Sequence, residues 1–144
     1  MKKKFSLSLL AIFMAPVLFG APIDVKIERS GKSNLGLSPI QQQGKNIETS
    51  SFQSFQDTFV ADLQYSRIFN LIQNGPIVKS RNDVGGWQKI GAEFVAAGNY
   101  SQSAKGIIEF KGQLYDAAAK KELVSLSSEK TVSSSRALAH DIAN

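Results

Sequence analysis

Two stretches in which apolar and polar side chains alternate, joined by a short polar connection, constrain the fold of this chain most strongly. In Ile107 to Asp116, one side carries Ile108, Phe110 and Leu114 and the other carries Glu109, Lys111 and Gln113. Leu123 to Val132 repeats the alternation, and Ala117 to Glu122 lies between the two stretches. Side chains alternate across a strand, so the pattern predicts a β-hairpin with one face on the core and one in water.

Three further segments are predicted strands. Leu35 to Ile40 is a short apolar strand stopped by a proline, which cannot donate to a strand ladder. Arg67 to Ile72 is followed by the turn signal Asn74-Gly75-Pro76. Ala92 to Tyr100 is nearly all apolar, as expected of a central strand buried on both faces. Between the first two strands, Gln41 to Asn46 is predicted to be a polar loop.

One long amphipathic helix is predicted over Ser51 to Ser66. Its apolar residues recur at intervals of three and four and fall on one stripe: Phe52, Phe55, Phe59 and Leu63. Ser50 and Gln53 have the spacing of a capping box at its start. The stripe is expected to pack on the sheet, and a ligand groove is the alternative interpretation.

Two shorter helical segments complete the pattern. A helical turn is predicted around Trp87 and Ile90, and a last helix is predicted in which Leu138 and Ile142 lie one turn apart, with Ser133 to Ser135 as N-cap oxygens. The fold class is therefore α/β (α+β), with a mixed sheet of about five strands and two main helices packed on it.

The first twenty residues have the organisation of a signal peptide. A lysine-rich start precedes the apolar run Leu7 to Phe19, and Pro22 favours cleavage after Gly20. We expect residues 1–20 to be removed and residues 21–144 to form one domain in the periplasm, and a retained N-terminal anchor is the alternative. No second apolar run of that length follows, so no transmembrane segment is expected after signal removal.

Composition excludes several kinds of chemistry. The chain has no cysteine and one histidine, which rules out disulfides, thiolate catalysis and a pair of imidazole metal ligands. His140 and Asp141 are adjacent on a predicted helix and point about 100° apart, so they cannot form a base and its orienting partner with each other. We therefore expect no enzyme activity, no metal and no cofactor.

Nucleic-acid binding is not expected either. The formal net charge of +5 includes Lys2, Lys3 and Lys4 of the leader, and the remaining basic residues are scattered through separate elements. Tyr100 and Tyr115 would form a platform for stacked bases only if they shared an exposed sheet face.

The first residues after the leader form a further alternating segment. In Ile23 to Glu28, the apolar side chains Ile23, Val25 and Ile27 alternate with the charged side chains Asp24, Lys26 and Glu28. This segment is either the first strand of the domain or an extended segment that adds to the sheet of a partner. The alternation by itself leaves both interpretations open.

The order of these pieces resembles the N-terminal domain of TolB, the periplasmic component of the Tol-Pal envelope system. The resemblance covers Ile23 to Asn144 and depends on several short motifs in the right order, of which ADLQYSRIF, LYD and RALAHDIAN are the most specific. It implies a mixed sheet with packed helices, similar to the anticodon-binding domains of some synthetases. It also implies a role in protein–protein contact.

The resemblance assigns partners as well. In that family the segment after the signal peptide docks on TolA, which makes Ile23, Asp24, Val25, Lys26, Ile27 and Glu28 the expected partner-binding residues. A C-terminal β-propeller of the family binds the lipoprotein Pal. No Ser-Pro-Asp-Gly repeats follow Asn144 here, so Pal binding is not expected, and the last helix is interpreted as cut short.

Two functional hypotheses follow. The first is a non-catalytic Tol-Pal interaction domain, with roles in outer-membrane integrity and in constriction of the envelope during division, which includes the case of a fragment of a full TolB. The second is a stand-alone envelope accessory domain that binds another periplasmic protein. The DNA downstream of codon 144 distinguishes them, because propeller repeats there would indicate a fragment.

Overall fold

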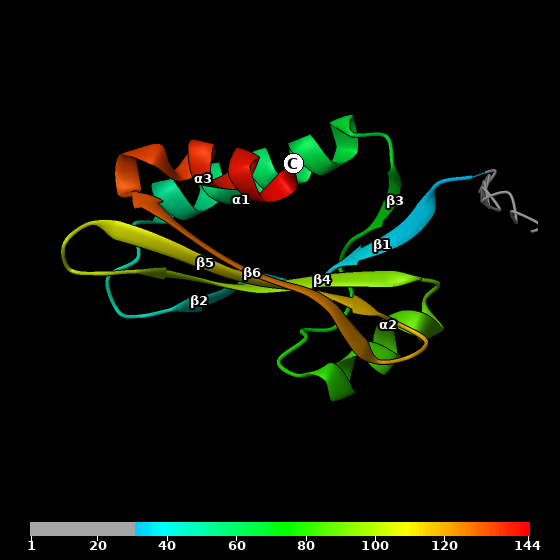
Figure 1. The fold of residues 1–144 in the computed structure, drawn as a ribbon. Coiled ribbons are helices and arrows are strands. Elements are labelled where there is room, and N and C mark those ends of the chain that lie inside the picture. The colour runs from blue at the N-terminus through cyan, green and yellow to red at the C-terminus, as the bar shows by residue number, and fades with distance from the viewer. Residues whose placement is uncertain (1–30) are drawn as a thin grey trace, which may run out of the picture.

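The computed structural model describes residues 31–144, in which a mixed sheet is covered by helices on both faces (Figure 1). The strands are β1 (Ser33–Leu37), β2 (Gln41–Gln43), β3 (Phe69–Ile72), β4 (Phe94–Gln102), β5 (Ile107–Asp116) and β6 (Lys121–Thr131). The helices are α1 (Thr49–Tyr65), α2 (Gly85–Lys89) and α3 (Ser135–Ala143), with 3-10 turns η1 (Arg81–Val84) and η2 (Val132–Ser134). The predicted fold class is confirmed, with six strands in the described residues instead of about five.

The strand order is β3-β1-β4-β5-β6, in which β1 pairs parallel with β3 and β4, and β4, β5 and β6 are antiparallel. The sixth strand, β2, pairs parallel with the far part of β4. The prediction of a polar loop was therefore wrong for Gln41–Gln43. The reason is the length of β4: β1 covers its edge only from Phe94 to Ala96, and the chain returns after Pro39 to pair with the edge that remains open.

The predicted hairpin is confirmed, and β5 has the predicted bounds. Strand β6 runs from Lys121 to Thr131, so it begins inside the predicted connection, and none of its residues is buried, so the predicted core face was wrong for this strand. The register of the β5–β6 pair shifts by one residue near the turn: Leu114 pairs with Val124, and Tyr115 pairs with Glu122. Leu123 is thus the extra residue of a β-bulge, which bends the strand locally. Since β6 is the last strand in the order, its outer edge has no strand partner among the described residues.

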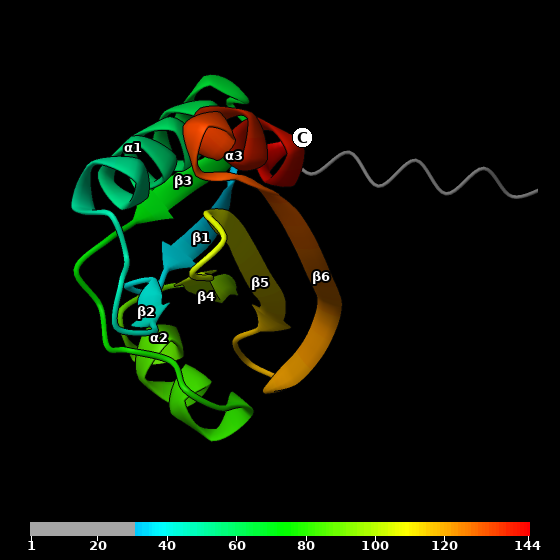
Figure 2. The ribbon, with the colours of Figure 1, turned by 90° about the vertical axis from the view of Figure 1, so that its left-hand side faces the viewer.

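The predicted stripe of α1 is buried against the sheet. Phe52, Phe55, Phe59 and Leu63 are each at most 9% exposed. The ring centroids of Phe52 and Tyr100 lie 5.2 Å apart, and those of Phe55 and Phe110 lie 5.0 Å apart. Helix α3 lies beside α1 on the same face, as Figures 1 and 2 both show, and buries Leu138 and Ala139 in the same cluster.

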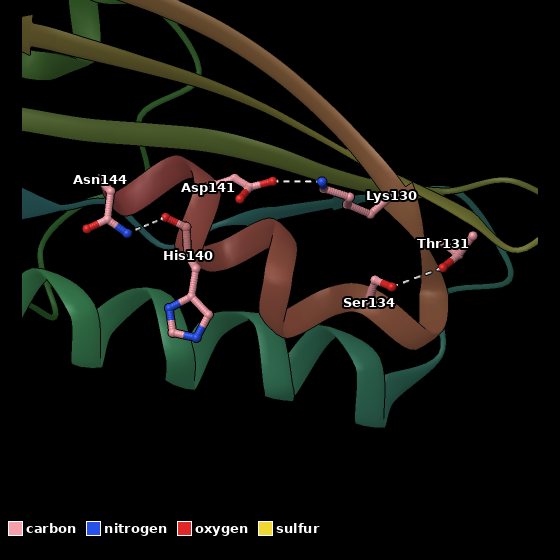
Figure 3. Close-up of polar contacts among 6 residues, drawn as sticks. All are labelled: Lys130, Thr131, Ser134, His140, Asp141 and Asn144. Carbon is pink, nitrogen blue, oxygen red and sulfur yellow. Dashed lines mark hydrogen bonds and ion pairs between the residues drawn. The ribbon is translucent and has the colours of Figure 1, made fainter.

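The predicted capping box of α1 was wrong, whereas the N-cap of α3 lies within the predicted Ser133 to Ser135 but lacks the predicted side-chain bond. The N-cap of α1 is Glu48 and has no side-chain cap bond, and the hydroxyl of Ser50 donates to the carboxylate of Glu48 (2.6 Å). The N-cap of α3 is Ser134, whose hydroxyl bonds that of Thr131 (3.2 Å; Figure 3). In both cases the serine hydroxyl bonds another side chain and not a backbone N–H group.

The opposite face of the sheet is covered by η1 and α2, below the sheet in Figure 1. Trp87 is fully buried there, and its indole N–H donates to the carbonyl of Pro76 (2.8 Å). A Cβ at Gly36 or at Gly75 would lie 2.4 Å from the indole ring, so both positions need glycine. The predicted helical turn around Trp87 is therefore confirmed.

Candidate protein-binding surfaces

The predicted partner-binding residues Ile23, Asp24, Val25, Lys26, Ile27 and Glu28 lie outside the described residues, as does the predicted leader. The described part begins at Gly31 and continues into β1. Strand β1 pairs with β3 from Ser33 and with β4 from Leu35, so it has a strand on each side. The segment that precedes β1 therefore joins the domain at an interior strand of the sheet.

A polar cluster fixes the start of β1. The backbone N–H of Asn34 donates to the carboxylate of Glu93 (3.0 Å), and the side-chain amide of Asn34 donates to the carbonyl of Gly91 (3.0 Å). The backbone N–H of Glu93 in turn donates to the carbonyl of Asn34 (2.9 Å). These bonds hold the point at which the N-terminal segment enters.

An apolar groove of about 450 Å³ lies between the helix layer and the sheet. Phe59, Val60 and Leu63 of α1 line one side, and strands β4, β5 and β6 and the last turn of α3 line the others. The predicted stripe therefore has two roles, because Phe52 and Phe55 lie in the closed core and Phe59 and Leu63 also border the groove.

The sequence missed the partners of the single histidine. His140 Nδ1 contacts the carboxylate of Asp62 on α1, and Lys130 Nζ lies 2.8 Å from the carboxylate of Asp141 (Figure 3). Figure 3 also shows the His140 ring pointing toward α1, away from Asp141, as the spacing predicts. The contact between His140 and Asp62 ties α3 to α1.

The two tyrosines do not form a stacking platform. Tyr100 belongs to the cluster under α1, and Tyr115 belongs to the cluster under α2, on the other face of the sheet. Both are buried, and burial raises the pKa of each hydroxyl. The Tyr100 hydroxyl pairs with that of Ser51 (2.8 Å), which makes it a structural group.

The described residues hold neither a cluster of metal-ligating side chains nor a membrane-spanning helix. Residues 31–144 contain no group of three or more histidine, cysteine, aspartate or glutamate side chains placed to hold a metal ion. None of their helices is long and apolar enough to cross a membrane.

Solved structures share this fold. TolB from Acinetobacter baumannii matches with a TM-score of 0.58 and 22% identity over 78% of this chain and 27% of that chain. The PelC dodecamer from Paraburkholderia phytofirmans matches with a TM-score of 0.57 and 11% identity over 77% of this chain and 84% of that chain. At these identities the likeness concerns the fold.

Sequence comparison gives the family. The chain is 30% identical over 139 residues to the Tol-Pal system protein TolB of Aromatoleum aromaticum, covering 94% of this chain and 32% of that protein. It thus spans about a third of the length of that relative. A model of the TolB amino-terminal domain family matches residues 21–123, which include both Ile23 to Glu28 and most of the described sheet. The chain therefore belongs to the TolB amino-terminal domain family.

Proposed function

We propose that this chain is a non-catalytic protein-interaction domain of the Tol-Pal system, which acts in the periplasm and contacts TolA through Ile23 to Glu28. The observation that supports this most directly is the family match over residues 21–123, because it takes in the alternating segment. Through that contact the domain would act in outer-membrane integrity and in envelope constriction during division.

The proposed contact is a strand addition. In an extended segment, Ile23, Val25 and Ile27 lie on one side and enter pockets of the partner, while the backbone pairs with a sheet edge of TolA. The start of β1 is held by the Asn34 and Glu93 bonds, so the segment is presented from a fixed point.

Deletion of residues 21–28 tests the proposal. We expect calorimetric titration to detect no binding to the C-terminal domain of TolA from the same organism, while the thermal unfolding midpoint stays close to that of the unaltered protein. Retained binding, or unfolding of the domain without a loss specific to binding, would refute the role of these residues and favour the accessory-domain hypothesis.

A matched pair of triple variants tests the proposed side. Replacing Ile23, Val25 and Ile27 by serine removes the side chains that enter the pockets, and replacing Asp24, Lys26 and Glu28 by serine leaves them. We expect the first variant to lose most of the affinity for TolA and the second to keep most of it. Equal losses would contradict the strand geometry.

Export is part of the same proposal. Residues 1–20 are expected to be cleaved, so the intact mass of protein from the periplasm should fall below 15.6 kDa by the mass of the leader. A mass near 15.6 kDa would show a retained leader and contradict this expectation.

A further inference from the structure

A recess lined by three cations lies where the turn between β5 and β6 meets η1. Its lining residues are Arg81, Tyr115, Ala119, Lys120, Lys121 and Glu122, and its volume is about 640 Å³. We call it the cationic recess. It lies on the side of α2, away from the groove under α1.

The three cations of the recess are not neutralised within the described part of the chain. None of Arg81, Lys120 and Lys121 has a nitrogen within 4.0 Å of a carboxylate oxygen there. The carboxylate of Asp83 accepts from the backbone N–H groups of Lys79 (3.0 Å) and Ser80 (2.9 Å), as part of a capping box. That box rigidifies the turn that carries Arg81 and occupies the carboxylate next to it.

The rest of the recess is also held in place. Lys120 has a left-handed backbone (φ 51°), and its side chain crosses Gly85, where a Cβ would lie 3.2 Å from Cε. Tyr115 is 7% exposed, and within residues 31–144 its hydroxyl has no hydrogen-bond partner but is not enclosed. Burial and the nearby Glu122 raise the pKa of Tyr115, so the hydroxyl stays a donor at neutral pH.

The recess continues into an open strand edge. Strand β6 begins at Lys121, and its outer edge has no strand partner among residues 31–144. Leu123, the extra residue of the β-bulge, is 46% exposed, and Val124, which also lines the groove under α1, is 49% exposed. Unpaired backbone groups on an edge strand accept an added strand, and a run of apolar side chains beside them favours one.

We propose that the cationic recess and the first residues of β6 bind an extended acidic segment of a protein partner. Its carboxylates enter the recess, its backbone pairs with the β6 edge, and its apolar side chains cover Leu123 and Val124. The recess is concave, which suits side chains better than a membrane surface. Glu122 inside it repels a dianionic phosphate more strongly than a single carboxylate. The proposal does not depend on Ile23 to Glu28.

The probe is a short fluorescein-labelled peptide in which glutamate alternates with leucine, and binding to the full chain is followed by fluorescence anisotropy. We expect the triple variant Arg81→Gln, Lys120→Gln, Lys121→Gln to weaken binding by about tenfold, since each exposed ion pair contributes modestly. The control variant Lys45→Gln, Lys105→Gln, Arg136→Gln carries the same charge change on exposed residues elsewhere and should bind as before. Equal losses would show that only net charge matters and would overturn the proposal.

Two further measurements separate the remaining possibilities. The same peptide with glutamine in place of glutamate should bind much more weakly, and unchanged binding would overturn the role of the cations. Phosphatidylglycerol vesicles should not distinguish the two triple variants. If the chain binds the vesicles but not the peptide, and only the recess triple variant loses vesicle binding, the partner is a lipid surface and the proposal of a protein partner is overturned.

A gain of affinity provides a test that misfolding cannot imitate. Glu122→Gln removes the one carboxylate of the recess, so we expect the acidic peptide to bind about two to five times more tightly. The matched variant Glu48→Gln, which lies at the start of α1, should leave the affinity unchanged. A decrease for Glu122→Gln would contradict the proposed charge complementarity.

Discussion

The two faces of the sheet are packed by different means. Under α1 and α3, one face is filled by many rings, in which Phe55 contacts the rings of Phe59, Tyr100 and Phe110 at centroid distances of 5.0 to 6.0 Å. Under α2, the cluster of the other face holds two rings, those of Trp87 and Tyr115, and the Trp87 indole packs on two glycines. A layer of many interlocking rings relaxes around a change, whereas a ring seated on two glycines has no side chains at those positions to fill the space that its loss leaves.

The largest expected effect is that of Trp87→Ala. The ring is fully buried and makes a hydrogen bond to Pro76, and the glycines beside it have no side chains to fill the space. We expect unfolding in urea to show a loss of about 5 kcal/mol in stability. A loss below about 2 kcal/mol would show that the α2 face contributes little to the fold.

Phe55→Ala is expected to cost less, about 3 kcal/mol, although this ring is also fully buried. Phe59 and Phe110 are its neighbours and also line the groove, so they have space to move toward the cavity. Urea unfolding of both single variants gives the comparison. A cost larger than that of Trp87→Ala would reverse the contrast between the faces, and a cost under about 1 kcal/mol would show that the stripe is not core.

Gly36→Ala sharpens the comparison by adding one methyl group under the indole. Its Cβ would lie 2.4 Å from Trp87 Cε3, and we expect overpacking to cost about 2 kcal/mol. Gly85→Ala is the matched control, because a Cβ there would meet only the flexible end of Lys120. That control should be neutral or slightly stabilising, since alanine favours the helix. Equal thermal midpoints for the two variants would argue against a rigid seat for the indole.

The smallest expected effect concerns the stability of the protein at low pH. Hydrogen bonds from the backbone of Lys79 and Ser80 lower the pKa of Asp83 below its usual 3.8. A lowered folded-state pKa means that this carboxylate stabilises the α2 face above the unfolded-state pKa, and that the contribution is lost as the pH falls through the folded-state value. Asp83→Asn should therefore flatten the acid limb of a plot of stability against pH below about 4. An unchanged acid limb would remove Asp83 from this role.

The parts of the fold that the sequence predicted are those governed by local periodicity. The alternation of Ile107 to Asp116 gave the bounds of β5, and the spacing of Phe52 to Leu63 gave α1 and its buried side. Strand β2 was missed because its three glutamines carry no apolar pattern and pair only because β4 extends past β1. The capping hydrogen bonds were mispredicted because the hydroxyls of Ser50 and Ser134 bond other side chains.

The candidate surfaces were predictable to different extents. The alternation of Ile23 to Glu28 is visible in the sequence, and its assignment to a partner depends on the family. The cationic recess has no sequence signal, because Arg81 lies about forty residues from Lys120 and Lys121. The contact of His140 with Asp62 is equally invisible, since it joins two helices that only the fold places side by side.

The sequence by itself determined the long helix α1, the hairpin and the buried side of α1, because backbone geometry makes these properties periodic along the chain. Only the tertiary structure decided what meets what. Trp87 packs on Gly36 and Gly75, and Arg81 meets the turn at Lys120, because non-local contacts depend on strand order and on the shape of the space that the layers leave.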